Sequence, residues 1–264
     1  VFVSYNNVYL VMELMAGGSL KQHLAVHKHI RESGMSPAQV QAVAGHVLAG
    51  LRCIHAAGII HRDVKPANVL VTGSGHCKIG DFGLAIRAHT AEGESGTPYY
   101  SPPEALSGAI YDARFDVWSL GIMLHEMVAL EIPVLAATVE ELLAGLLKCG
   151  DSVDVSTLAG SAEMKAAIGS CLVIDANNRP SSENLAELPW FAAAISPEAL
   201  SRPVPDFPYN LSAYELFEHK RARLLTKLQA AEDADAAITD QEELAATSAH
   251  LGKFVRKLKA GNWF

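Results

Sequence analysis

Two apolar runs separated by a pair of polar turn residues at the start of the chain predict a short β-hairpin. The run VFVSYNNVYLVMEL places Val, Tyr, Leu and Phe in strand-like positions on either side of the turn-forming pair Asn6-Asn7. The segment AGGSL at 16–20 then interrupts the strand pattern, and KQHLAVHKHIRE at 21–32 predicts a short polar helix.

The clearest helical pattern begins after Ser36, which can cap the helix, with Pro37 suited to its first turn. An apolar face then recurs at helical spacing, at Val40, Val43, Val47, Leu48, Leu51 and Ile54. Gly58 follows in the position of a C-terminal cap. Further helical patterns occupy 115–130, 138–149, 161–173 and 181–193.

Two short strand patterns in the first half of the chain, NVLVT at 68–72 and HCKIG at 76–80, flank the turn residues GSG. The segment 81–104 that follows is rich in Gly, Ser, Thr and Pro and predicts a long loop. Loops of this length without structure of their own are usually functional or disordered.

The composition changes near residue 196, where SPEALSRPVPDFPYN carries four prolines. This predicts a Pro-rich linker at 194–211, followed by a helical tail at 212–264. The two tail helices are predicted from capping-box patterns, Ser212 with Glu215 and Thr239 with Glu242. Their apolar stripes are expected to pack within the protein first, with a partner protein as the second option.

The overall composition narrows the class of protein. A chain of 264 residues with 50% hydrophobic residues can bury a substantial core, and a net charge of -8 argues against nucleic-acid or anionic-membrane binding. No apolar run is long enough to span a bilayer and no signal peptide is visible, so we expect a soluble cytoplasmic protein, with the nucleus as the alternative compartment. Widely spaced cysteines favour reduced thiols, of which only Cys77 is a candidate reactive residue. The others are Cys53, Cys149 and Cys171.

The strongest signal for chemistry is HRDVKPANVL at 61–70, followed by DFG at 81–83. Asp81 and Asn68 can bring side-chain oxygens to one hard cation such as Mg²⁺, which prefers oxygen ligands and phosphate. Asp63, if it stays off the metal, can accept a proton from an attacking hydroxyl, and Lys65 can hold a phosphoryl group by its point charge. In isolation, the Asp and Asn residues could equally be turn formers.

In this order and at this spacing, the two motifs resemble the HRD-x-K-x-x-N catalytic loop and the DFG motif of the eukaryotic protein kinases. The resemblance implies that Asp63 is the catalytic base and that Lys65 contacts the γ-phosphate. It implies that Asn68 and Asp81 are metal ligands, and that ATP and Mg²⁺ are the cofactors.

The same resemblance implies an α+β, protein-kinase-like fold over residues 1–193. It would consist of the final strands of the N-terminal lobe and the hinge at 1–16, and the mainly helical C-terminal lobe at 17–193. GTPYYSPPE resembles the end of an activation segment, in which Glu104 would pair with Arg179. DVWSLG resembles the central helix, whose Asp116 would bond the HRD backbone, and LPWF resembles the closing helix of the lobe.

The segment YLVMELMAGGSL resembles the strand and hinge that hold adenine. By this resemblance, Met12 is the gatekeeper, and the backbones of Glu13 and Met15 pair with the adenine edge. Ser19 would lie near the ribose, and Leu70 would pack under the base.

The acceptor is expected to be a serine or threonine hydroxyl of a protein substrate. Lys65, two residues after Asp63, matches the serine/threonine pattern, and Thr97 of GTPYY would bond both residues and shape the acceptor pocket. Within the serine/threonine kinases, GTPYY before the PPE motif most resembles the NIMA-related group.

Arg62 suggests regulation by phosphorylation, because kinases with Arg at this position often need a negative charge on the activation segment. The candidate phosphoacceptors are Thr90 and Ser95, with Glu92 and Glu94 as partial substitutes.

The histidines are expected to be structural. His23, His27 and His29 are interpreted as a solvated helical face rather than a metal cluster. His61 is predicted to be a packed residue that supports Phe82.

The sequence contains no GxGxxG loop, no VAIK-like strand, and no helix before the hinge to supply the paired Glu. We therefore expect an N-terminally truncated version of an active kinase, and weak or absent phosphoryl transfer by this chain alone. The alternative is a pseudokinase or scaffold that binds partners without phosphoryl transfer. A phosphotransferase for small molecules is disfavoured by Arg62, Lys65, PPE and DVWSLG.

Overall fold

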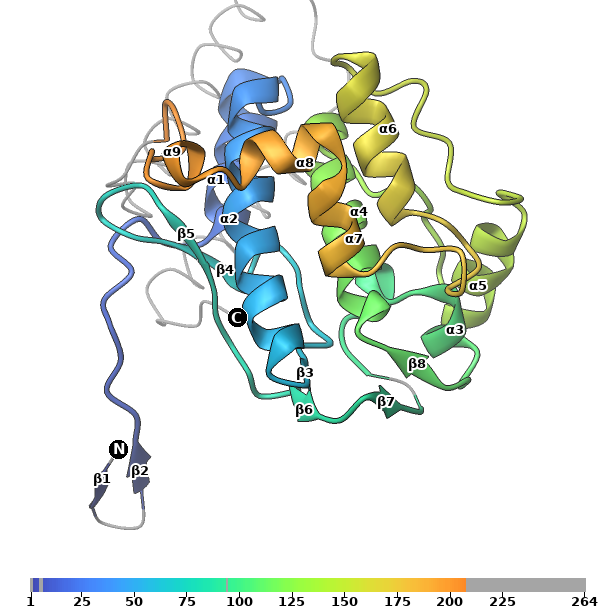
Figure 1. Cartoon of the computed structure of the whole chain (residues 1–264), viewed down its shortest axis with the longest axis horizontal. Coiled ribbons are helices and arrows are strands. Elements are labelled where there is room, and N and C mark those ends of the chain that lie inside the picture. The colour runs from blue at the N-terminus through green and yellow to red at the C-terminus, as the bar shows by residue number, and fades with distance from the viewer. Residues whose placement is uncertain (1, 5–6, 94, 208–264) are drawn as a thin grey trace, which may run out of the picture. The chain divides into compact units, whose positions relative to one another are not determined.

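The computed structural model of the chain describes residues 2–4, 7–93 and 95–207 (Figure 1). The predicted α+β class is confirmed by a set of helices and short antiparallel strand pairs. The predicted tail helices lie outside the described residues. Within those residues, no helix combines the length and apolar character that crossing a membrane requires.

The helices account for most of the regular structure. They are α1 (Leu20–Val26), α2 (Pro37–Ala56), α3 (Pro103–Leu106), α4 (Arg114–Ala129), α5 (Val139–Leu147), α6 (Ala162–Cys171), α7 (Ser182–Glu187), α8 (Pro189–Ala194) and α9 (Pro197–Leu200). The strands are β1 (Phe2–Ser4), β2 (Asn7–Tyr9), β3 (Ile59–Ile60), β4 (Val69–Val71), β5 (Cys77–Ile79), β6 (Ile86–Arg87), β7 (Thr90–Ala91) and β8 (Tyr111–Asp112). They pair as β1 with β2, β3 with β6, β4 with β5, and β7 with β8, all antiparallel.

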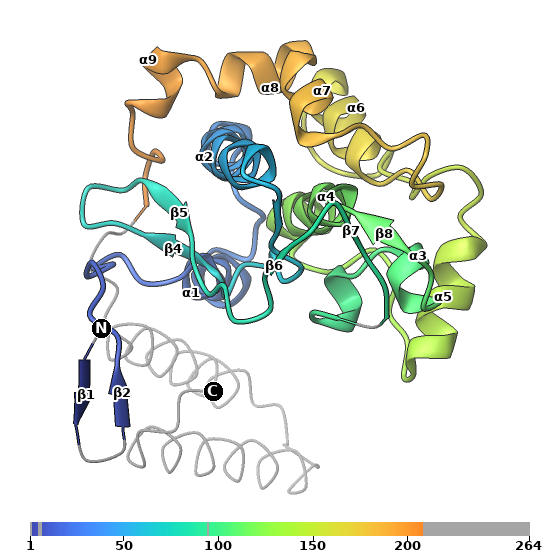
Figure 2. The same cartoon turned by 60° about the horizontal axis from the view of Figure 1, so that its bottom comes forward.

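Helices α2 and α4 form the centre of the core, and Figure 2 shows them side by side and nearly end-on. The predicted start of α2 is confirmed: the Ser36 hydroxyl accepts a hydrogen bond from the Gln39 backbone, and Pro37 begins the helix. Helix α4 is buried on almost every side, and Trp118 has no exposed surface. A Cβ added at Gly121 would lie 2.6 Å from Cys171 Cβ, so a glycine is required where α4 meets the end of α6.

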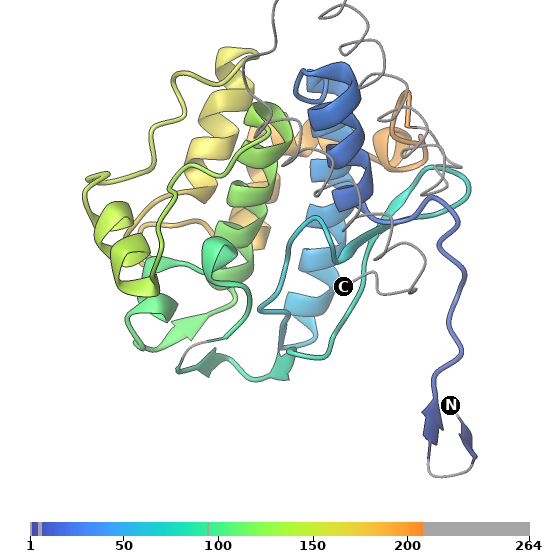
Figure 3. The ribbon, with the colours of Figure 1, turned by 180° about the vertical axis from the view of Figure 1, so that it is seen from behind.

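Helix α1 differs from the polar helix that the sequence predicted. Figure 3, from behind, shows α1 together with the π-helix His27–Arg31 that continues it. His23 and His27 are 1% and 5% exposed, so their interpretation as a solvated face is wrong. Each ring bonds a backbone carbonyl, of Gly17 and Ser33 respectively, which allows a neutral imidazole to be buried.

Two other predictions of regular structure need correction. The pattern at 181–193 forms two helices, because Leu188 is extended (φ -66°, ψ 133°) before Pro189, and the residue before proline avoids the helical region. The predicted loop at 81–104 is not structureless, since β6, β7 and the 3-10 turn Pro98–Tyr100 lie within it and α3 begins at Pro103. Strands of two residues are too short to leave a sequence pattern.

The opening hairpin exists, and Asn7 pairs with Ser4 as a residue of β2 instead of lying in the predicted turn. The second strand of the hairpin ends at Tyr9. The apolar side chains that follow are exposed: Leu10, Val11, Met12 and Leu14.

Part of the predicted linker is folded. Residues 197–200 form α9, which contacts α2, and Val204 and Phe207 are 0% and 3% exposed. The proline-rich composition is therefore compatible with an ordered segment up to residue 207.

Candidate active site

The HRD segment follows β3 and is held by a carboxylate from α4. Asp116 accepts hydrogen bonds of 2.8 Å from the backbone N–H groups of both His61 and Arg62, as predicted. Arg62 has a φ of 67°, a backbone conformation that is uncommon outside glycine, and these bonds help to maintain it. His55 of α2, which the sequence did not single out, contacts Asp116 Oδ2 at 2.7 Å through Nε2.

Four of the predicted site residues meet at one cluster. Thr97 Oγ1 donates to Asp63 Oδ1 at 2.8 Å, and Lys65 Nζ donates to the same hydroxyl at 2.6 Å. Lys65 Nζ also lies 2.8 Å from Asp63 Oδ2. Asn68 Nδ2 donates to Asp63 Oδ2 at 2.7 Å and to the Asp63 carbonyl at 2.9 Å. The Asp63 carboxylate, only 8% exposed, is thus oriented through both oxygens.

A backbone hydrogen bond places Asp81 near this cluster. The Gly80 N–H donates to the Asn68 carbonyl at 2.8 Å, which brings the start of DFG next to the segment that follows HRD. Asp81 has a φ of 57°, and its exposed carboxylate accepts a bond from the Gly83 N–H. Because Asn68 uses its Nδ2 donors on Asp63, its Oδ1 atom is the one available to a cation.

These donors fit a hard divalent cation. Among the described residues, no group of three or more His, Cys, Asp or Glu side chains could hold a metal ion. A Mg²⁺ site with one or two protein oxygens and the remainder from phosphate and water is the usual arrangement in phosphoryl-transfer sites. Asp81 and Asn68 match that donor set.

The ring of His61 packs edge-on against Phe82, with centroids 4.9 Å apart, which confirms its predicted structural role. Its Nε2 atom lies 3.0 Å from the Gly80 carbonyl. His61 therefore connects the HRD and DFG segments.

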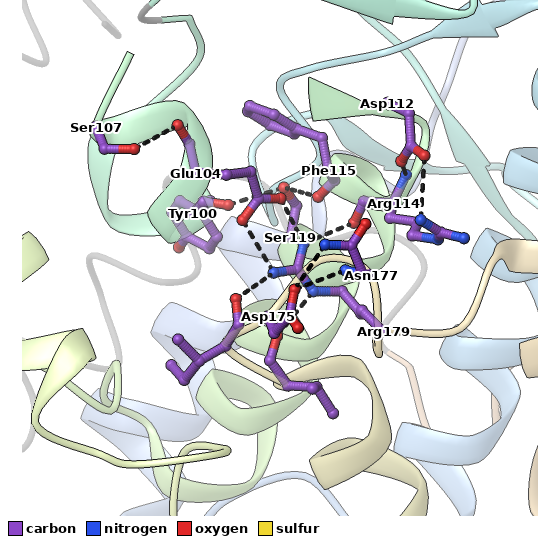
Figure 4. A network of polar contacts seen from close by, with 12 residues as sticks. Tyr100, Glu104, Ser107, Asp112, Arg114, Phe115, Ser119, Asp175, Asn177 and Arg179 are labelled. Carbon is purple, nitrogen blue, oxygen red and sulfur yellow. Dashed lines mark hydrogen bonds and ion pairs between the residues drawn. The ribbon is translucent and has the colours of Figure 1, made fainter. Parts of the chain in front are cut away.

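The expected ion pair between Glu104 and Arg179 connects the end of the predicted activation segment to the base of the lobe. Arg179 donates to both carboxylate oxygens of Glu104, at 2.7 and 3.1 Å, and its side chain is fully buried (Figure 4). The guanidinium also lies 4.9 Å from the Trp118 ring centroid. Ser119 Oγ donates to the Tyr100 carbonyl, so α4 holds the segment at a second point (Figure 4).

The residues predicted to hold the nucleotide are only partly brought together. Ser19 and Leu70 form an isolated antiparallel bridge. Met12 is 73% exposed, and the Glu13 carboxylate forms an exposed ion pair with Lys78 at 2.6 Å. The Met15 carbonyl accepts a bond from the Gly18 N–H in a tight turn.

Sequence reasoning missed a half-buried carboxylate, that of Glu126, beside the acceptor region. Tyr100 donates a 2.5 Å hydrogen bond to Glu126 Oε2, and burial raises the pKa of both groups, with the Glu126 charge also raising that of Tyr100. The only available signal was one Glu within the apolar run of α4. This pair positions Tyr100 on the core side of the segment that carries Thr97.

Cys77 is not the reactive thiol that the sequence suggested. Burial raises its pKa to about 12, so the thiolate is scarce at neutral pH. All four cysteines are free, in agreement with the predicted reduced thiols.

Arg62, the residue behind the phosphorylation hypothesis, already has partners on the lobe. Its Nε donates to the Leu84 carbonyl at 2.7 Å, and one terminal nitrogen donates to the Tyr111 hydroxyl at 3.3 Å. Thr90 is exposed in β7, Ser95 is half-buried, and Glu94 lies outside the described residues. Control by phosphorylation stays a prediction.

Comparison with known proteins defines the class. The model of the protein kinase domain matches residues 1–191, so the chain belongs to the protein kinase family.

Individual relatives carry the names of serine/threonine-protein kinases. The chain is 34% identical over 199 residues to STE20 of Debaryomyces hansenii, 33% over 202 residues to CLA4 of Eremothecium gossypii, and 34% over 204 residues to pakA of Dictyostelium discoideum. Each match covers 74% of the chain but only 18%, 26% and 16% of the relative, respectively. None of these three names indicates the NIMA-related group, which stays a prediction.

Proposed function

We propose that the chain carries the catalytic groups of a serine/threonine protein kinase, which transfers the γ-phosphate of ATP to Ser or Thr hydroxyls of proteins. The observation that carries this proposal is the cluster in which Asp63 bonds Thr97, Lys65 and Asn68 at once. The names of the relatives and the family match support the same class.

In the proposed reaction, the acceptor hydroxyl lies against the Asp63 carboxylate, which takes its proton as the oxygen attacks the γ-phosphorus. The bond from that phosphorus to the bridging oxygen breaks, and ADP leaves. Lys65, which is 23% exposed beside Asp63, offsets the negative charge of the transferred group. Asn68 and Asp81 would hold the divalent cation, proposed as Mg²⁺, which neutralises phosphate charge.

Thr97 would place the acceptor. Its hydroxyl bridges the Asp63 carboxylate and the Lys65 ammonium group. It therefore fixes the distance between the proposed base and the lysine proposed to contact the phosphate.

For the nucleotide, we propose contacts from Glu13 and Met15 backbone groups to adenine, with Met12 beside it, Ser19 near the ribose and Leu70 beneath the base. The Ser19–Leu70 bridge supports the last two. Protein substrates, a partner for the tail and a cytoplasmic location are part of the same proposal.

The test is transfer of labelled phosphate from ATP and Mg²⁺ to a peptide mixture containing Ser, Thr and Tyr acceptors, with Asp63→Asn as the control. We expect weak transfer to Ser and Thr by the 264-residue chain, since its sequence has no Gly-rich loop. We expect strong transfer when the small lobe of a relative such as pakA is joined before Val1. An inactive chimaera that still binds ATP would favour the pseudokinase alternative.

A further inference from the structure

The most unusual feature outside the proposed active site is the segment 197–207, which packs on the lobe through three histidines. The Phe207 ring stacks on His23 of α1, with centroids 4.3 Å apart and planes 14° apart. His76, before β5, lies 3.2 Å through Nε2 from the Ser201 carbonyl, and its ring centroid is 5.3 Å from that of His46 in α2.

Backbone and amide contacts fix the same segment. The Val204 N–H donates to the Gly75 carbonyl at 2.9 Å, and Gln39 Nε2 donates to the Pro205 carbonyl at 3.0 Å. Val204 is fully buried. The segment therefore contacts α1, α2 and the β4–β5 turn through defined bonds.

His23 is packed as a neutral ring. Its Nε2 lies 2.8 Å from the Gly17 carbonyl and donates to it, which leaves Nδ1 as the unprotonated nitrogen. Nδ1 is buried and has no hydrogen-bond partner among the described residues. A proton added there would create a buried N–H without an acceptor, directly beside the Phe207 stack.

His46 is also packed as a neutral ring, for a different reason. Its Nδ1 accepts a 3.2 Å hydrogen bond from the Cys77 N–H, so a proton at Nδ1 would place two donors against each other. Its buried Nε2 likewise makes no hydrogen bond within the described part of the chain, although the backbone of Leu200 and Arg202 lies near.

We propose that the segment 197–207 is a proton-sensitive latch, which is docked while His23 and His46 are neutral and is released when they are protonated. Release would expose both rings to water, which can accept hydrogen bonds from the protonated nitrogens. The proposal concerns regulation of the lobe and does not depend on the proposed kinase activity.

The surroundings of His23 and His46 lower the pKa of both rings, which favours their neutral forms in the docked state. Burial lowers the pKa of His23, the Gly17 carbonyl partly opposes this, and the His27 ring lowers it further. Burial and the neighbouring His76 lower the pKa of His46, against the backbone of Leu200 and Arg202.

The sign of the pH effect follows. A histidine whose pKa is lowered in the docked state binds fewer protons there than after release. Docking is therefore at full strength above about pH 6.5 and weakens as the pH falls below it. Each histidine contributes up to about tenfold between roughly pH 7.5 and 5.5, so the pair contributes up to about 100-fold over that range.

The latch also contacts, through His23, the segment that precedes Ser19, the residue proposed to lie near the ribose. His23 joins Phe207 on one face to the Gly17 carbonyl at its edge, and Gly17 lies two residues before Ser19. Release of Phe207 is thus expected to loosen the segment between the hinge and α1.

The test is hydrogen exchange of the amides at 199–207 in the full 264-residue chain, corrected for the intrinsic pH dependence of exchange. We expect protection of the Val204 amide to fall by about 10- to 100-fold between roughly pH 7.5 and 5.5. The amides of α4 should keep their protection over the same range. Equal protection of Val204 at both pH values, or parallel loss in α4, would overturn the latch.

Non-titrating variants complete the test. H23F keeps an aromatic ring against Phe207, and H46Q keeps an acceptor for the Cys77 N–H. We expect each single variant to remove part of the pH dependence, and the double variant to remove nearly all of it. If the double variant does not fold, the test rests on whether H23F and H46Q each reduce the pH dependence of protection.

The matched control is H125Q. His125 of α4 is a buried histidine whose pKa burial also lowers, but it bonds the Glu131 carbonyl and lies outside the latch. We expect H125Q to keep the full pH response of 199–207. A response abolished by H125Q, or retained in full by H23F and H46Q, would contradict the proposal.

Discussion

The imidazole of His55 lies 2.7 Å from the Asp116 carboxylate, and its other nitrogen lies 2.8 Å from Ser182 Oγ. A chain of contacts thus runs from α7 through α2 to the carboxylate that holds the HRD backbone. Asp116 has no exposed surface, so every lone pair must be satisfied within the protein.

Substitution D116N is expected to lower the free energy of unfolding by about 2–3 kcal/mol, because the amide replaces one acceptor with a donor facing a backbone N–H. Urea denaturation followed by circular dichroism measures the change. The matched control is D112N in the half-exposed pair with Arg114, where we expect a change within about 0.5 kcal/mol. Equal effects of the two variants would show that the Asp116 contacts do not stabilise the fold.

Removal of the Glu104 carboxylate is expected to be severe. E104A leaves the fully buried Arg179 guanidinium without its counter-ion, which typically costs about 3–5 kcal/mol. Thermal unfolding measures the loss, and R52A provides the control because its ion pair with Glu183 is exposed and should leave the midpoint unchanged. A midpoint for E104A as high as that of R52A would argue against an energetic role for the buried pair.

The bridging hydroxyl of Thr97 can be tested within the proposed kinase function. T97A removes its hydrogen bonds with Asp63 and Lys65, and we expect phosphoryl transfer by the chimaera to fall by about 10- to 100-fold. T97S keeps the hydroxyl and should retain most of the activity. Equal loss in both variants would indicate that the methyl group, rather than the hydroxyl, matters.

Thiol reactivity should follow burial. Cys53 is exposed, whereas Cys77 and Cys171 are buried with pKa values raised to about 12. At about pH 8 we expect an aromatic disulfide reagent to modify Cys53 rapidly, and the two buried thiols only after denaturation, because so little thiolate forms. Mass spectrometry of digested protein identifies the modified residue, and C53S should abolish the fast phase. Rapid modification of Cys77 in the folded chain would contradict its burial.

The Asp63 cluster, the position of DFG beside it and the Glu104–Arg179 pair could be predicted because these residues fall in short motifs. Burial of His23 could not be predicted, since its partners Gly17 and Phe207 lie on opposite sides of it in sequence, one of them far away. His55 and Glu126 escaped notice for a related reason: their roles depend on residues from other elements. The roles of the nucleotide residues stay predictions, because Met12 and Glu13 face solvent here.

The packing of Phe207 on His23 also changes where the folded unit ends. The family match stops at residue 191, yet Val204 and Phe207 are as buried as the central helices. A version shortened at the family boundary would lose part of its interior and expose His23, His46 and the β4–β5 turn. The packed interior of this lobe therefore extends beyond the family boundary, at least to residue 207.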